Sequence, residues 1–164
     1  MAGRSTLTVV NGVIFIDLKK AFDTIDHSLL IGKLHKYGVA TSSLKCFDSY
    51  FFDSSQNCSI NGHLAGVALV SCGVPEGSNL GALLLLVYIN GVPNCLSSAS
   101  ARMFADDTNI TLAASAIADL EIVVNLELRK LICWLVINML SLNVFKTEFV
   151  VIESNQRIHV LWNN

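Results

Sequence analysis

A pair of adjacent carboxylates, Asp106-Asp107, constrains the fold of this chain more than any other feature. The pair stands between two short stretches of strand-forming residues, Met103–Ala105 and Thr108–Leu112, and is therefore predicted to occupy the tip of a β-hairpin. Neighbouring carboxylates repel each other, and a cation opposite them removes that cost. Hard divalent cations such as Mg²⁺ take oxygen ligands. The pair therefore predicts a magnesium site.

A third carboxylate, Asp17, follows the apolar run Val9 to Ile16, which is predicted to be a buried strand. Sites with two metal ions about 3.5–4 Å apart need carboxylates that the ions share. We therefore expect Asp17, Asp106 and Asp107 to converge and to bind metal. The competing interpretation is that Asp17 ends a strand and the pair fills a polar turn, because Asp favours turns through its own backbone hydrogen bonds.

Four segments of the chain resemble, in order, the motifs of reverse transcriptases from non-LTR (LINE-type) retrotransposons. They are Phe15 to Asp23, Gly73 to Gly81, Phe104 to Asp107, and Leu140 to Glu148. The resemblance implies an α+β fold of the reverse-transcriptase palm type, with an antiparallel sheet and helices packed on one face. We expect a single domain spanning residues 1–164.

The resemblance also implies an activity and its ligands. The expected reaction is RNA-directed DNA polymerisation, which transfers nucleotides from dNTPs to a primer 3′-hydroxyl with two Mg²⁺ ions, or Mn²⁺ in their place. The expected partners are an RNA template, a DNA primer and a dNTP. The implied catalytic residues are Asp17, Asp106, Asp107 and Lys146, of which the three carboxylates hold metal and Lys146 approaches the leaving pyrophosphate.

Three further residues are implied to contact substrate: Phe22, Glu76 and Gly77. Phe22 corresponds to an aromatic gate that excludes a 2′-hydroxyl, although an ordinary core Phe would also fit the position. Gly77 belongs to a glycine-rich loop that lets backbone approach a nucleotide closely. Glu76 stands where the family usually has Gln, and an ionised Glu cannot donate the hydrogen bond that Gln donates.

Further departures from the family pattern indicate drift in a decaying element copy. They lie at Cys46, Ser55, Asn79, Ala82 and Gly91. An alternative function is therefore a catalytically silent remnant with at most weak nucleic-acid binding. A palm-fold nucleotidyl cyclase is another alternative, but its hairpin would be expected to read Gly-Gly-Asp/Glu-Glu-Phe or similar.

Length and charge predict a fragment. The chain has 164 residues, a net charge of −2 and 11 basic residues, which argues against a self-sufficient nucleic-acid binder because phosphate affinity comes largely from Lys and Arg. The fingers and thumb segments of the parent polypeptide are expected to be missing or truncated. We therefore expect the isolated chain to be inactive.

No membrane segment is expected. The most apolar stretch, Leu80 to Ile89, has about ten residues where a spanning helix needs ~20, and the N-terminus lacks the apolar segment of a signal peptide. An intracellular location, nuclear or cytoplasmic, is predicted. The five cysteines are predicted to be small buried hydrophobes in a reducing compartment.

Helices and strands are predicted from caps, turns and hydrophobic periodicity. Helices are expected after the cap Asp26, over Ser42 to Phe52, over Ser78 to Tyr88, and over Ala116 to Asn138. Asn61-Gly62 predicts a hairpin turn. Two strands are expected at Glu148–Ile152 and Arg157–Leu161.

Overall fold

The structure is a computed structural model that describes most of the chain. The described residues are 9–52, 54–57, 59–61, 63–64, 66–104, 107–153 and 158–159. They form two compact units. Residues before 20, residues 91–137 and residues after 140 form the first, which we call the sheet unit, and residues 20–90 with 138–140 form the second, the helical unit. The prediction of a single domain over 1–164 stays a prediction.

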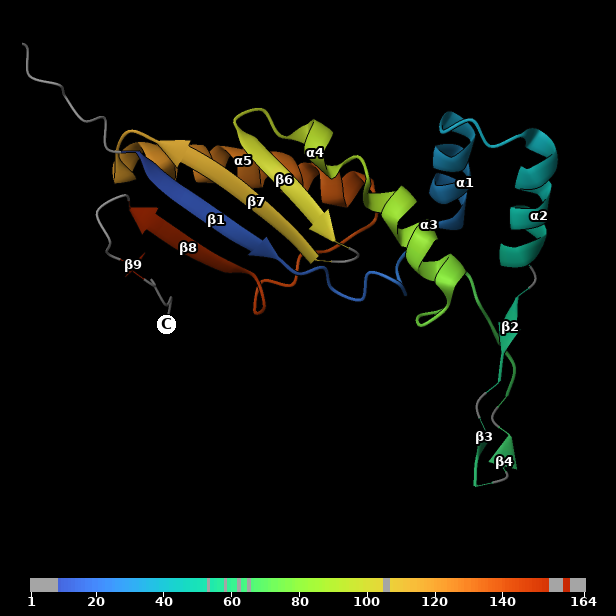
Figure 1. Ribbon diagram of the computed structural model, residues 1–164. Coiled ribbons are helices and arrows are strands. Elements are labelled where there is room, and N and C mark those ends of the chain that lie inside the picture. Colours follow the sequence, from blue (N-terminus) through green and yellow to red (C-terminus); the bar gives the residue numbers. More distant parts are fainter. Residues whose placement is uncertain are drawn as a thin grey trace, which may run out of the picture. The chain divides into compact units, whose positions relative to one another are not determined.

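The sheet unit is built around its N-terminal strand. The antiparallel sheet has the order β6-β7-β1-β8-β9, so β1 lies between strands that come much later in the chain (Figure 1). The strands are β1 (Val10–Ile16), β6 (Ala99–Phe104), β7 (Asp107–Ala114), β8 (Glu148–Glu153) and β9 (Ile158–His159). The mixed α+β class with an antiparallel sheet is confirmed.

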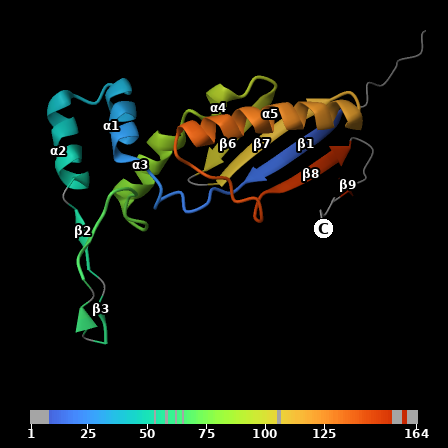
Figure 2. The same cartoon turned by 180° about the vertical axis from the view of Figure 1, so that it is seen from behind.

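One long helix covers one face of this sheet. α5 (Ile117–Ile137) packs on β7 and β1, and Figure 2 shows it lying along the sheet. The short α4 (Val92–Cys95), which the sequence did not predict, contacts α5 and β6. The core between helix and sheet is aliphatic and includes Ile14, Ile110, Leu112, Leu120, Leu131 and Leu135.

Glu127 is a buried carboxylate inside this core. Its side chain is only 2% exposed, and it accepts hydrogen bonds from the Ser97 amide (2.9 Å) and from Lys130 Nζ (2.6 Å). Burial alone would raise the pKa of Glu127, but the hydrogen bonds from Lys130 and from the backbone of Ser97 and Ser98 lower it overall. The carboxylate therefore ties α5 to the chain that leads into β6.

Among the residues that the structure describes, the helical unit contains three helices and two short ribbons. Its helices are α1 (His27–Lys36), α2 (Thr41–Phe51) and α3 (Asn79–Ile89), and α1 contacts both of the others. The ribbons pair β2 (Ser55–Gln56) with β5 (Ala68–Leu69), and β3 (Ser59–Ile60) with β4 (His63–Leu64). Its largest buried side chains include Ile25, Leu30, Leu84, Leu85, Tyr88 and Ile89.

Local sequence signals were read correctly at three positions in this unit. Asp26 is the N-cap of α1 and accepts a hydrogen bond from the Leu29 amide, and Ser78 caps α3 in the same way. Asn61 has a φ of 52° and connects the paired residues Ile60 and His63, as expected for an Asn-Gly hairpin turn.

The expectation that the cysteines are buried was wrong for three of them. Cys46, Cys72 and Cys133 are exposed, because helix periodicity turns Cys46 and Cys133 outward and Cys72 lies in a loop. The apolar stretch after Leu131 is buried along one face of α5 and leaves Val136 exposed. Within the part of the chain that the structure describes, no helix is both long and apolar enough to cross a membrane.

Candidate functional site

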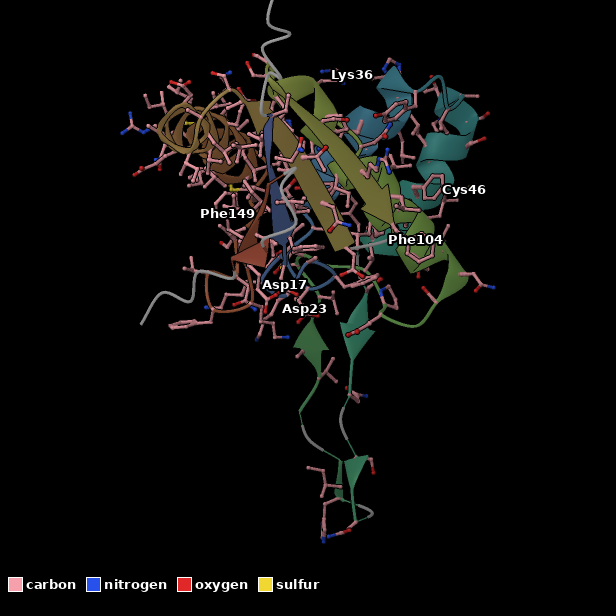
Figure 3. The ribbon with its side chains drawn as sticks, turned by 60° about the vertical axis from the view of Figure 1, so that its left-hand side comes forward. Asp17, Asp23, Lys36, Cys46, Phe104 and Phe149 are labelled. Carbon is pink, nitrogen blue, oxygen red and sulfur yellow. The ribbon has the colours of Figure 1, made fainter. Side chains whose placement is uncertain are left out.

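Asp17 directly follows the last residue of β1, and Asp107 is the first residue of its partner strand β7. β1 and β7 pair residue by residue as far as Ile16 with Thr108, and the same register carried one residue further aligns Asp17 with Asp107. Residues directly opposite in antiparallel strands have Cα atoms about 4.5–5.5 Å apart. Figure 3 labels Asp17 just beyond the end of β1. The first and third motifs therefore meet at one end of the sheet, although Asp106 itself lies outside the described residues.

The fourth motif is hydrogen-bonded to the residues that follow β1. The Asn143 amide donates to the Asp17 carbonyl (2.8 Å), Leu18 and Leu142 form an antiparallel bridge, and the Lys19 amide donates to the Ser141 carbonyl (2.8 Å). These main-chain bonds fix the backbone on which the Asp17 carboxylate is carried.

Lys146 lies in the turn between this bridge and β8. Its amide donates to the Asn143 carbonyl (3.1 Å), which also accepts the Thr147 amide and hydroxyl. The Lys146 side chain is exposed. The turn that carries this ammonium group is thus anchored, through Asn143, to Asp17.

The side chains at this end of the sheet have the chemistry of a hard-metal site. Asp17 is half-buried and Asp107 is exposed. Among the described residues, neither carboxylate makes a salt bridge or a side-chain hydrogen bond. Two carboxylates with free oxygens fit a divalent cation. The described residues contain no group of three metal-ligating side chains, and the predicted third ligand, Asp106, is not among them.

In the helical unit, the second motif is bound to the end of the first. The Val74 amide donates to the Phe22 carbonyl and the Gly73 amide to the Ile25 carbonyl, both at 2.8 Å. Gly73 has a φ of 90°, and a Cβ added there would lie 2.9 Å from the carbonyl oxygens of Phe22 and Asp23. Only glycine fits at position 73, because any side chain there would collide with the chain's own backbone.

The rest of the glycine-rich loop is held by its helix cap. Ser78 Oγ accepts from the Gly81 amide (2.9 Å) and donates to the Pro75 carbonyl (2.9 Å), and a Cβ at Gly81 would collide with that carbonyl. Between them, Glu76 and Gly77 are exposed, and Gly77 has a φ of 79°. The loop therefore presents Glu76 and Gly77 on a fixed frame.

A cavity of about 660 Å³ adjoins this loop within the helical unit. Its walls carry two carboxylates, from Asp23 and Glu76, and the described lining residues include neither Lys nor Arg. Phosphate groups bind chiefly through cationic side chains. The cavity as it stands therefore does not suit a triphosphate.

Two buried residues that the sequence analysis left without a role hold this frame together. His27 Nε2 lies 2.7 Å from the Gly73 carbonyl, and its ring stacks on Phe51 with centroids 4.5 Å apart. The Tyr88 hydroxyl donates to the Asn138 carbonyl (2.7 Å) and accepts from the Asp26 amide (3.3 Å). The hydrogen-bond partners are all main-chain groups distant in sequence, so side-chain patterns could not have revealed them.

One departure from the family pattern has a packing explanation. A Cβ on Gly91 would lie 3.1 Å from the Trp134 ring. The Asp that the resemblance leads one to expect at this position would therefore press on the indole of α5.

Phe22 is half-buried, and its predicted contact with a sugar stays a prediction. The predicted substrate contacts of Glu76 and Gly77 stay predictions as well.

Comparison with known proteins identifies a family. The family model described as reverse transcriptase (RNA-dependent DNA polymerase) matches residues 3–161. A search among curated proteins found no match. The matched range includes all four sequence motifs and every strand and helix described above.

Proposed function

Because the chain belongs to the reverse transcriptase family, we propose that it is the palm of an enzyme that extends a DNA primer on an RNA template from dNTPs. We further propose that its parent is a LINE-type retrotransposon and that the chain is a degraded copy. The observation that supports the polymerase assignment best is the end of β1, where the register aligns Asp17 with Asp107 and Asn143 binds the Asp17 carbonyl.

Asp17, Asp106 and Asp107 would hold two Mg²⁺ ions. Such ions, when bound, lower the cost of deprotonating the attacking hydroxyl and of developing charge on the leaving oxygen. The chain's own contribution is to hold the Asp17 carboxylate on a backbone fixed on both sides, by β7 and by the Asn143 turn. The Lys146 ammonium, anchored through the same turn, would give a proton to the leaving pyrophosphate or neutralise its charge.

Phe22 would select the sugar. The Phe22 carbonyl accepts a hydrogen bond from the Val74 amide. A Phe22 ring placed against C2′ of the nucleotide sugar would therefore have little freedom to move away. In a complete, active relative, replacing the matching Phe by Ala should raise ribonucleotide incorporation and leave thermal stability nearly unchanged. A Phe that only packs in the core should instead cost about 3–5 kcal/mol on truncation and lower incorporation of dTTP and UTP together.

The competing proposal is a catalytically silent remnant. It is favoured by Glu76, an exposed carboxylate in the loop where the family usually has Gln, and by the shortage of basic residues. Under this proposal the purified chain shows little or no primer extension, and Glu76→Gln does not restore it.

Two arms of a primer-extension assay on poly(rA)/oligo(dT) separate these proposals. The first uses the purified chain, and robust Mg²⁺-dependent extension would refute the silent remnant. The second inserts residues 9–153 between the fingers and thumb of an active relative. Extension by this chimera that is lost in Asp17→Asn and Asp106→Asn supports the metal assignment.

The matched control in the chimera is Asp23→Asn. Asp23 is an exposed carboxylate of the first motif that the proposal does not use as a ligand, so activity should persist. If Asp23→Asn abolishes extension as completely as Asp17→Asn does, the ligand assignment is wrong.

A further inference from the structure

The ribbon of the helical unit lacks the features that normally protect strand edges. Exposed edges are usually guarded by charged residues or proline. Residues 54–74 contain no Asp, Glu, Lys, Arg or Pro. β2 and β5 pair only with each other, so each has one edge with no partner strand among the described residues.

The hydrogen bonds of the ribbon show which groups lie on the free edge of β5. The Val70 amide donates to the Ser54 carbonyl (2.9 Å), and antiparallel pairs alternate between hydrogen-bonded and non-hydrogen-bonded. Ala68, paired with Gln56, therefore also directs its amide and carbonyl toward β2. The Val67 carbonyl, which shares a peptide plane with the Ala68 amide, and the amide and carbonyl of Leu69 point the other way, toward the free edge.

The side chains along this edge are apolar and uncovered. Val67 is 67% exposed and Leu69 is 79% exposed. Because successive side chains alternate between faces, these two lie on the same face of the ribbon. The free edge of β5 thus combines unpaired main-chain groups with two solvated aliphatic side chains.

We propose that this edge pairs with the same edge of a second copy of the chain, antiparallel about a two-fold axis at Ala68. Val67 of each copy then exchanges two main-chain hydrogen bonds with the partner's Leu69, and the side chains of these residues meet across the strands. A two-fold contact of this kind is self-complementary. It converts two marginal two-stranded ribbons into one four-stranded sheet.

Charge favours a second copy over a nucleic acid. An RNA or DNA strand is bound chiefly by Lys and Arg, and the segment 54–74 has neither. Two identical neutral edges meet without repulsion, and each provides the apolar pair that the other needs. The inference does not depend on polymerase activity, because it uses only the ribbon.

The first test measures the oligomeric state of the full 164-residue chain by sedimentation velocity over a range of micromolar concentrations. We expect a concentration-dependent dimer. Val67→Lys or Leu69→Lys should raise its dissociation constant about tenfold or more, because each lysine appears twice at the interface and loses a cross-strand apolar pair. The matched control is Ile60→Lys, since Ile60 is equally exposed, at 67%, but lies on β3; this variant should still dimerise.

The second test uses a disulfide. Ala68 of the two copies would form a non-hydrogen-bonded pair, with a Cα separation that a disulfide can span. In a background with the five native cysteines replaced by serine, Ala68→Cys should give a covalent dimer on mild oxidation, and Ser59→Cys should not.

Three results would overturn the proposal. One is a wild-type chain that stays monomeric at every concentration. Another is self-association that Val67→Lys and Leu69→Lys leave unchanged. The third is a chain that is monomeric alone but whose RNA affinity changes with these variants, which would assign the edge to nucleic acid.

Discussion

The two units hold their site residues by different means. In the sheet unit, β1 is paired along its length with β7 and with β8, so the position of Asp17 depends on many equivalent main-chain bonds. In the helical unit, the loop from Gly73 to Gly81 depends on a few unique contacts, such as His27 with the Gly73 carbonyl. We therefore expect single substitutions to be tolerated better near Asp17 than near Gly73.

The largest difference should appear between two glycines, one in each unit. Gly73→Ala should lower the free energy of unfolding by about 3 kcal/mol or more, because alanine is strained at a φ of 90° and its Cβ would press on two carbonyl oxygens. Gly12→Ala should cost about 1 kcal/mol, because its Cβ meets the tips of the Phe149 and Leu120 side chains, which can shift. Urea unfolding of both variants measures the two values.

Equal losses for the two glycine variants would contradict this contrast. A Gly73→Ala protein that is as stable as the wild type would show that the backbone around Phe22 adjusts freely. The helical unit would then be the more tolerant of the two.

A smaller effect is expected from Glu127 in the sheet unit. Glu127→Gln should cost about 1–3 kcal/mol at neutral pH, because it weakens charge-assisted hydrogen bonds to Lys130 and to the Ser97 amide. The folded-state pKa of Glu127 is lowered from its ordinary value of 4.5. The stabilisation is therefore complete above pH 4.5 and is lost as the pH falls through the folded-state pKa.

Melting curves of wild type and Glu127→Gln from neutral to acid pH check this prediction. The two melting temperatures should converge on acidification. A constant difference down to the lowest pH would mean that the charge of Glu127 is not what stabilises the α5 contact.

The smallest effect is expected from Lys33 in the helical unit, and it occurs at alkaline pH instead of acid pH. Burial of the Lys33 ammonium, followed by the nearby Lys36, lowers the Lys33 pKa from 10.5 to about 8. Between these values the unfolded chain binds more protons than the folded one, so stability rises with pH. The gain should be small because the ammonium is half exposed to solvent.

Melting temperatures of the wild type and Lys33→Met, measured from pH 7 to pH 10, test this slope. The wild type should gain stability relative to the variant above about pH 8, the pKa of Lys33. If the melting temperatures of the wild type and Lys33→Met change with pH in the same way, Lys33 is not the group that titrates. The Lys33 Nζ also donates to the Tyr88 carbonyl and lies over the Tyr88 ring. Both contacts favour the charged ammonium, so they oppose the lowering of its pKa and reduce the slope.

Local signals were enough to predict much of the fold. Asp26 and Ser78 start helices because their side chains accept amide hydrogen bonds at the N-cap, and the Asn61-Gly62 turn follows from the φ that Asn tolerates. The strand ending at Ile16 was predicted from its apolar run. These elements depend on neighbours within a few residues, which a sequence shows directly.

Features that depend on distant partners were missed. β6 begins at Ala99, before the predicted Met103–Ala105, and β7 continues to Ala114, past the predicted Thr108–Leu112. Strand pairing stabilises the additional residues, because β6 pairs with β7 and β7 pairs with β1. The roles of Glu127 and His27 depend on carbonyls and amides far away in the sequence. The same limit applies to the candidate site. The sequence shows which side chains could bind metal, but it does not show the strand register that aligns Asp17 with Asp107.

The central position of β1 has a consequence for the order in which the protein folds during synthesis. Residues 20–90, nearly all of the helical unit, leave the ribosome as one continuous stretch and can begin to pack early. Val10, by contrast, pairs with Glu153, so β1 must wait for β8, which is made later than the whole helical unit. Contacts of such long sequence separation form slowly. Until β7 and β8 have been made and paired, β1 has open edges and an apolar sequence, and we expect this interval to be when the chain is most vulnerable to aggregation.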